Sequence, residues 1–394
     1  GSGTPPPDVA ALIGDVVAQV PAIRELEPKR DVPYEMITRE QFRTQLEQLL
    51  AEEVDPEQLA AEERLLKRLG LLPDDTDLAE LLLELYGAQV AAFYEPENGR
   101  FYIIERDEDF SAMDRMIVAH EYTHALQDQH FDLEGTRVTD PSQGDAALAQ
   151  QAVVEGDATL VMSYWAQENL SFDELLELLE ESLAPAEQET LEGMPPILSR
   201  QLLFPYSEGA MFVGTIEQEQ GWQPINDLLQ RPPASTEQIL HPEKYATAEA
   251  PVQVQIPDVS KALGTGWQRS YEQTFGELNT QIWLAADEEL PNQVPGMPAK
   301  YPFAEEAEGW GGDRLHMYEA ADGGWAVVWE LAWDSQEDAD EFRARALELQ
   351  ARLDGVSDID AVCDGNNDCL ADSIRLLIAS DDATLERLKD GLGR

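Results

Sequence analysis

The most informative stretch of this chain is Met116-Ile-Val-Ala-His120-Glu121-Tyr-Thr-His124-Ala-Leu-Gln-Asp128. It contains an H-E-x-x-H pattern inside an apolar run with helical periodicity. His120 and His124 are four residues apart, so a helix places both imidazoles on one face, one turn apart. The two rings can then bind one Zn²⁺ ion. Glu121 would lie beside that ion, where a carboxylate can accept a proton from metal-bound water.

Histidine is rare in this chain, which makes the motif specific. The sequence has five histidines, and three of them lie between positions 120 and 130. The alternative is a surface helix that carries two histidines by chance. However, the flanking residues Met116–Ala119 and Ala125–Leu126 are apolar and indicate a partly buried helix, where two histidines without a partner would be costly. The stretch therefore predicts a metal site.

A catalytic zinc ion usually has three protein ligands, so a third ligand is needed. Glu155 is the first candidate, because it lies in the middle of an apolar segment that predicts one long helix from Asp145 to about Asn169. A carboxylate in such a helix needs a partner, since buried acids are rarely left unpaired. A metal ion is a suitable partner.

His130 is the second candidate. It follows His120 by ten residues, which is the spacing of the metzincin pattern H-E-x-x-H-x-x-G-x-x-H. Gln127 stands where that pattern has the glycine that turns the chain back toward the metal. A helix that continues through Gln127 would carry His130 about 15 Å along its axis. We therefore favour Glu155, and expect His130 to be a cap or core histidine near the helix end.

With these residues, the sequence resembles the gluzincin metallopeptidases, the thermolysin-like class. The segment from His120 to Asp128 is similar to the active-site helix of thermolysin, and Glu155-Gly156-x-Ala158 resembles the ligand segment of gluzincin aminopeptidases. The two segments together look like a group of secreted bacterial metallopeptidase-like proteins. The resemblance is strong over residues 85–165 and weaker to about residue 250. It implies a zincin-like domain with an active-site helix and a small sheet.

The chain departs from thermolysin at two points. The gap before Glu155 is longer, and Thr159 occupies the position where the family has an aspartate that orients a ligand histidine. Because metal-bound histidines normally donate a hydrogen bond to an outer carboxylate or carbonyl, Asp128 and Asp157 are the candidates for that role.

A β-hairpin is expected just before the motif helix. Residues 90–104 contain two runs rich in β-forming residues around Pro96-Glu-Asn98-Gly99, which places Asn98 and Gly99 in the turn. In gluzincins an edge strand lies beside the active-site helix. We therefore hypothesise that one of these strands binds extended peptide by strand addition.

Zinc peptidases usually also supply a donor to the oxyanion of the tetrahedral intermediate. Tyr206 and His241 are the candidates for this catalytic role. Tyr206 lies between two expected helices, and His241 precedes Pro242, which favours an extended backbone. The alternatives are a packed aromatic for Tyr206 and an ordinary loop residue for His241.

The composition excludes several partner classes. Asp and Glu number 79 against 26 Lys and Arg, which gives a formal net charge of −53. Such a surface repels phosphate groups, so we expect no nucleic-acid binding and no binding to anionic membranes. The sequence has no apolar run long enough to span a membrane. The expected partner is a peptide or protein substrate.

Two features favour an extracellular or cell-surface location. The segment Thr4-Pro-Pro-Pro7 is typical of a flexible tether after a removed signal or lipid anchor. Cys363 and Cys369 flank a short turn and are spaced to close a small disulfide loop, which would fit an oxidising compartment. The Asp and Asn residues between them lack the glutamate that ends a calcium-binding EF-hand loop.

We expect an α+β protein that is mostly helical, in three parts. Residues 1–32 form a tether and a short helix, residues 33–250 the zincin-like domain, and residues 258–394 a smaller α+β domain. The elements expected in and before the last part are a linker strand at Pro251–Pro257, a helix at Tyr271–Ala286, a strand at Trp325–Trp333, a helix from Asp334 to about Leu353, a strand at Ser373–Ser380 and a helix at Ala383–Gly391.

The sequence therefore predicts a zinc-dependent peptidase. His120, His124 and Glu155 would bind zinc, Glu121 would act as general base, and Tyr206 or His241 would stabilise the oxyanion. A rival from another class is a zinc-binding scaffold or binding protein that has the fold without proteolytic activity.

Overall fold

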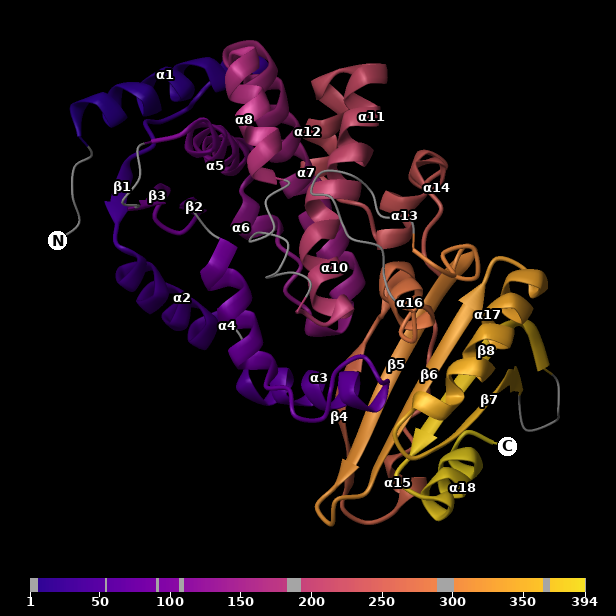
Figure 1. Cartoon of the computed structure of the whole chain (residues 1–394). Helices are drawn as coiled ribbons and strands as arrows, with labels where there is room; N and C mark the ends of the chain where they lie inside the picture. Colours follow the sequence, from indigo (N-terminus) through magenta and orange to yellow (C-terminus); the bar gives the residue numbers. More distant parts are fainter. Residues whose placement is uncertain are drawn as a thin grey trace.

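The computed structural model describes residues 6–53, 55–89, 92–105, 110–182, 193–288, 301–363 and 369–393. The fold is α+β, with more helix than strand, as expected. Figure 1 shows a small sheet at one end of the molecule, a larger sheet at the other, and helices between them.

The first part of the chain is mostly helical and includes the small sheet. Its elements are α1 (Pro7–Arg24), β1 (Tyr34–Ile37), α2 (Arg39–Glu53), α3 (Pro56–Arg68), α4 (Leu78–Gln89), β2 (Ala92–Glu95), β3 (Arg100–Ile104), α5 (Ala112–Phe131), α6 (Leu133–Thr136), η1 (Pro141–Gln143), α7 (Gly144–Asn169), α8 (Phe172–Ser182), α10 (Pro196–Phe204), η2 (Pro205–Gly209), α11 (Ala210–Gln220), α12 (Trp222–Gln230), α13 (Thr236–Leu240) and α14 (Pro242–Ala246).

The second part contains the larger sheet. Its elements are α15 (Ser260–Leu263), β4 (Trp267–Gln273), α16 (Gly276–Leu284), β5 (Trp310–Ala320), β6 (Trp325–Trp333), α17 (Gln336–Leu349), η3 (Gln350–Arg352), β7 (Val356–Cys363), β8 (Cys369–Ala379) and α18 (Asp382–Gly391).

The small sheet has the strand order β1-β3-β2. β2 and β3 form the predicted antiparallel hairpin, and Gly99 has the positive φ of 65° that the turn requires. β1, which the sequence analysis did not anticipate, pairs in parallel with β3. β2 is consequently an edge strand, and it packs against α5.

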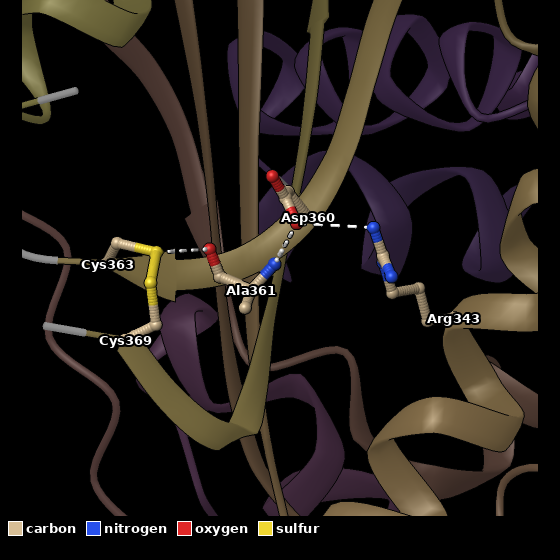
Figure 2. The surroundings of a disulfide bond; sticks show 5 residues. All are labelled: Arg343, Asp360, Ala361, Cys363 and Cys369. Carbon is tan, nitrogen blue, oxygen red and sulfur yellow. Dashed lines mark hydrogen bonds and ion pairs between the residues drawn. A yellow bond between two sulfur atoms is a disulfide. The ribbon is translucent and has the colours of Figure 1, made fainter. Parts of the chain in front are cut away.

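The larger sheet is antiparallel, with the strand order β4-β5-β6-β8-β7. Phe342 of α17 packs on Trp329 and Trp333 of β6 on one face. On the other face, buried side chains of α15 and α18 pack against Val328 and Leu377. Figure 2 shows the disulfide between Cys363 and Cys369, which joins the ends of β7 and β8. Residues 364–368, between the cysteines, lie outside the described residues.

Two predicted elements of this part are wrong. The expected helix at Tyr271–Ala286 is a strand, β4, followed by the shorter helix α16. Gly276, with φ of 83°, separates them, and the Asp313 carboxylate accepts hydrogen bonds from the N–H of Gly276 and of the residue before it. The expected linker strand at Pro251–Pro257 is irregular, because its prolines lack an N–H group for a sheet ladder. β5 and β7 were not predicted.

One apolar core runs through both parts of the chain. The same cluster of buried side chains includes Val16 of α1, Val153 of α7, Trp283 of α16 and Trp329 of β6. The indole N–H of Trp283 also donates to the backbone carbonyl of Leu69 at 3.1 Å. The helices that carry the H-E-x-x-H motif and Glu155 are therefore held in a core to which the larger sheet contributes.

A contact between two glycines fixes the position of η2 on α7. A Cβ on Gly156 would overlap the carbonyl group of Gly209, and a Cβ on Gly209 would overlap the carbonyl of Ala152. Only glycine at both positions lets the two backbones approach this closely. η2 is a π-helical turn between α10 and α11 that contains both Tyr206 and Gly209.

We predict that Gly156→Ala lowers the free energy of unfolding by about 2 kcal/mol or more, because backbone atoms would have to separate to admit the methyl group. Gly214→Ala on α11 is the matched control, since its Cβ would meet only the end of the Leu160 side chain at 3.6 Å. That variant should be neutral or gain up to about 1 kcal/mol. Urea denaturation measures both, and equal effects would contradict this account of the contact.

Candidate metal centre

α5 presents the motif as one uninterrupted helix. Ser111 caps its N-terminus, where the Ser111 hydroxyl and the Asp114 carboxylate form a capping box with each other's backbone N–H. The helix continues through Gln127 and ends at Phe131. His130 therefore lies in the last turn, and its Nε2 contacts the backbone carbonyl of Glu27 at 2.8 Å. The chain does not turn back toward His120 as a metzincin site would require.

Three side-chain atoms from α5 and α7 converge on one point. The Nε2 atoms of His120 and His124 are 3.0 Å apart. The Glu155 Oε2 atom lies 3.1 Å from the first and 3.3 Å from the second. The side chains of the three residues are 10%, 11% and 16% exposed, so the cluster is mostly shielded from water.

This triangle has the dimensions of a tetrahedral metal site. Ligand atoms about 2.0–2.1 Å from a tetrahedral metal ion lie about 3.3–3.4 Å apart, close to the distances within the cluster. The described residues contain a second acidic group of similar compactness, Glu237, Glu249 and Asp334. There the Lys244 ammonium already pairs with all three carboxylates. The group on α5 and α7 is therefore the stronger candidate for a metal site.

The electrostatics of the cluster favour a bound cation. Burial acts to raise the pKa of Glu155, but the two histidines more than offset it and hold that pKa below its usual range. Burial acts to lower the pKa of His124, but the Glu155 carboxylate raises it to about 9. A proton and a metal ion compete for the same lone pairs, so both shifts describe a site that attracts positive charge.

A chain of hydrogen bonds orients His124. Its Nδ1 lies 2.8 Å from the Gln127 Oε1 atom. The Gln127 amide nitrogen donates to the Asp157 carboxylate at 2.8 Å and to the Val154 carbonyl, so its oxygen is the atom that faces His124. His124 Nδ1 must then be the donor, which leaves the Nε2 lone pair directed at the cluster.

The chain of hydrogen bonds continues to the N-terminal helix. The Nε of Arg24 donates to Asp157 at 2.7 Å, and both side chains are fully buried. The guanidinium also bonds Asn226 and lies over the ring of Trp222. α1 therefore forms part of the support of the metal cluster, the name used here for the side chains of His120, His124 and Glu155. Asp157, a candidate from the sequence, acts on His124 through Gln127.

Glu121 points beside the cluster. The backbone N–H of Tyr94 on β2 donates to its Oε2 atom at 2.7 Å. Burial raises the pKa of Glu121, while the neighbouring His124 and His120 act to lower it. Asp128, the other candidate from the sequence, accepts instead from the Tyr94 hydroxyl and from Arg30. The edge strand β2 thus holds the carboxylate that stands next to the three ligand atoms.

The two predicted oxyanion donors have different positions. The Tyr206 ring centroid is 6.0 Å from that of His120, so the tyrosine lies at the cluster. His241 Nε2 lies 2.9 Å from the fully buried carboxylate of Glu277. Among the described residues, no hydrogen bond or ion pair of His241 reaches the metal cluster. Tyr206 therefore lies at the cluster, whereas His241 is paired with Glu277, and its role as an oxyanion donor stays a prediction.

Sequence reasoning did not predict the roles of three residues of the site: Gln127, Arg24 and Tyr94. Arg24 had a detectable signal, since it is a basic residue at the end of an amphipathic helix in a chain poor in basic residues. Its partner Asp157 is 133 residues away, and no local pattern predicts such a pairing. Tyr94 contributes only a backbone N–H to Glu121, which leaves no mark in the sequence.

Comparison with known proteins covers only the second part of the chain. Residues 263–385 match a family described as a domain of unknown function (DUF8575). This segment contains β4, α16 and the rest of the larger sheet, but none of the residues of the metal cluster. No curated protein and no solved structure is significantly similar to the chain.

We predict that Gln127→Leu weakens zinc affinity about 10- to 100-fold, because His124 loses the acceptor that fixes its tautomer and ring orientation. Gln129→Leu is the matched control. It changes a buried glutamine on the same helix that bonds the backbone of residues 29 and 30 instead. Competition with a zinc chelator measures both affinities, and equal losses would show that Gln127 has no specific role in orienting His124.

Proposed function

We propose that this protein is a zinc-dependent peptide-bond hydrolase with a zincin-like, gluzincin-type site. The observation that carries the proposal is the cluster of His120, His124 and Glu155 donor atoms, 3.0–3.3 Å apart, with Glu121 beside it. Two imidazoles and one carboxylate are the ligand set of thermolysin-type catalytic zinc. Three protein ligands leave a fourth position for water or substrate.

Zinc is the metal that fits this donor set best. Imidazole nitrogen suits zinc, whereas magnesium and calcium prefer sites built from oxygen atoms alone. The hydrogen bond from His124 to Gln127, backed by Asp157 and Arg24, is the outer support that metal-bound histidines normally have.

Glu121 is the proposed general base. A zinc ion bound at the cluster supplies Lewis-acid polarisation of the scissile carbonyl and lowers the pKa of its water. The Glu121 carboxylate accepts the proton of the attacking water and then donates it to the leaving amine. The N–H of Tyr94 keeps that carboxylate in place. The Tyr206 hydroxyl, beside His120, donates a hydrogen bond to the developing oxyanion.

The proposed substrate is a peptide or protein in extended conformation. β2 is the edge strand of its sheet and lies against α5, and we propose that the substrate adds along this edge next to Glu121. A net charge of −53 argues against nucleic acid as a ligand. Among the described residues, no helix is long and apolar enough to cross a membrane.

We place the protein outside the cytosol or at the cell surface. The supporting observation is the Cys363–Cys369 disulfide, because disulfides persist in oxidising compartments and are rare in the cytosol. A secreted location also agrees with the proposed activity on peptides or proteins.

We predict that Glu121→Gln lowers kcat by about 10³-fold or more while zinc stays bound, because the amide has no basic oxygen to take the water proton. Glu134→Gln is the matched control, since Glu134 is exposed on α6 outside the cluster. Hydrolysis of a protein substrate such as casein, with zinc content measured on the same samples, gives both quantities. A zinc-loaded parent without any hydrolysis would favour the rival function, a zinc-binding scaffold.

A further inference from the structure

A pocket lies on the side of α7 that carries Glu155. Its volume is about 550 Å³, within the range of ligand-binding pockets, and its walls come from α3, α7, α10, β4, α16 and the residues around α6. Leu148 and Gln151 both line it. They precede Glu155 by seven and four residues, so the three side chains lie on one face of the helix. Gln151 is one turn, about 6 Å along the axis, from the metal ligand.

The lining of this pocket has an unusual charge for this protein. It contains one acid, Glu62, and one base, Arg137, so its formal charge is zero, whereas the chain as a whole carries −53. The other polar lining residues are all carboxamides: Gln150, Gln151, Gln201, Gln273 and Asn279. The lining of this pocket, beside the helix that carries Glu155, therefore does not select for a charged group on a ligand.

Carboxamides are well suited to contact a peptide. A carboxamide has both donors and an acceptor, the complement of backbone N–H and C=O groups, although Gln150 already uses its nitrogen and its oxygen on the backbone of Thr136 and Val138. The Gln201 amide nitrogen donates to the Asn279 Oδ1 atom at 2.8 Å, and the Asn279 amide nitrogen donates to the Phe275 carbonyl at 2.7 Å. These bonds fix the wall opposite α7 and use only the nitrogen of Gln201. Its carbonyl oxygen has no other bond among the described residues and can accept from a ligand.

Both parts of the chain build this pocket. α7 and α10 provide Gln151 and Gln201, while β4 and α16 provide Gln273 and Asn279. The last two residues lie within residues 263–385, the segment that matches the domain of unknown function. The pocket therefore places that domain opposite the helix that carries Glu155.

We propose that this pocket is a specificity subsite that binds an uncharged residue of the peptide substrate, close to the scissile bond. Gln151, exposed on α7, is the residue that faces this substrate side chain, and the domain at residues 263–385 forms the opposite wall. The inference rests on the proposed peptidase function and specifies its substrate: a peptide with an uncharged side chain at one position near the cleaved bond.

The test introduces a negative or a positive charge at one exposed position of the pocket. Gln151→Glu and Gln151→Lys are compared with Gln167→Glu, an equally exposed position nearer the far end of α7. Zinc-loaded proteins are probed with a positional peptide library. Binding is measured in a Glu121→Gln background and cleavage in the parent background. Binding should favour uncharged residues at one peptide position.

We expect Gln151→Glu to raise the preference for Lys over Gln at that one position about fivefold, the size of an exposed ion pair. Gln151→Lys should shift it in the opposite direction, toward acidic residues, and Gln167→Glu should leave it unchanged. Opposite shifts exclude a purely steric effect.

The two proposals fail in different ways. Cleavage by the parent with the same preferences in all variants overturns the subsite and leaves the peptidase function intact. Absence of peptide binding in the Glu121→Gln background also overturns the subsite. Charge-dependent binding without any cleavage by the parent supports the subsite and overturns the hydrolytic activity.

Discussion

The structure around the site depends on one constraint: three donor atoms from two helices share a space that fits one metal ion. The Nε2 atoms of His120 and His124 and the Oε2 atom of Glu155 are all within 3.3 Å of one another. Polar atoms so poorly exposed to water need a partner. They stay together only if α5 and α7 are held in a fixed register, and the surrounding contacts provide that register.

Those contacts come from parts of the chain that are far apart in sequence. On one side, Arg24 of α1 holds Asp157, which fixes Gln127 and through it His124. On the other side, the contact between Gly156 and Gly209 holds η2 against α7, and the Tyr206 ring of η2 lies near His120 of α5. The apolar core then extends through α16 to the larger sheet. The metal cluster is thus supported by the N-terminal helix and by the domain at residues 263–385 together.

Local patterns predicted the features that depend on local physics. The four-residue spacing of the histidines, the apolar run around Glu155 and the Asn98-Gly99 turn each follow from the periodicity or turn chemistry of one segment. The α7 helix begins one residue from its expected start and ends at the expected Asn169. β6 matches its expected range of Trp325–Trp333.

The features that sequence reasoning missed depend on long-range contacts. Residues 271–286 contain enough helix-favouring residues to predict one helix. However, residues 271–273 pair with β5 and are part of the strand β4. Propensity is a weak guide where tertiary pairing opposes it. The pairing of His241 with the buried carboxylate of Glu277 joins residues that are 36 positions apart, so no local pattern indicates it. The role of Gln127 required knowing that Asp157 faces it from another helix.

The zinc content of the purified protein tests the central claim most directly, with Glu155→Ala and His130→Ala measured beside the parent at the same free zinc concentration. The account predicts one equivalent of zinc in the parent and in His130→Ala, and little in Glu155→Ala. The reason is that Glu155 belongs to the ligand triangle and His130 does not. Full zinc in Glu155→Ala together with loss in His130→Ala would contradict the His-His-Glu site. A parent that binds no zinc would contradict the metal centre itself.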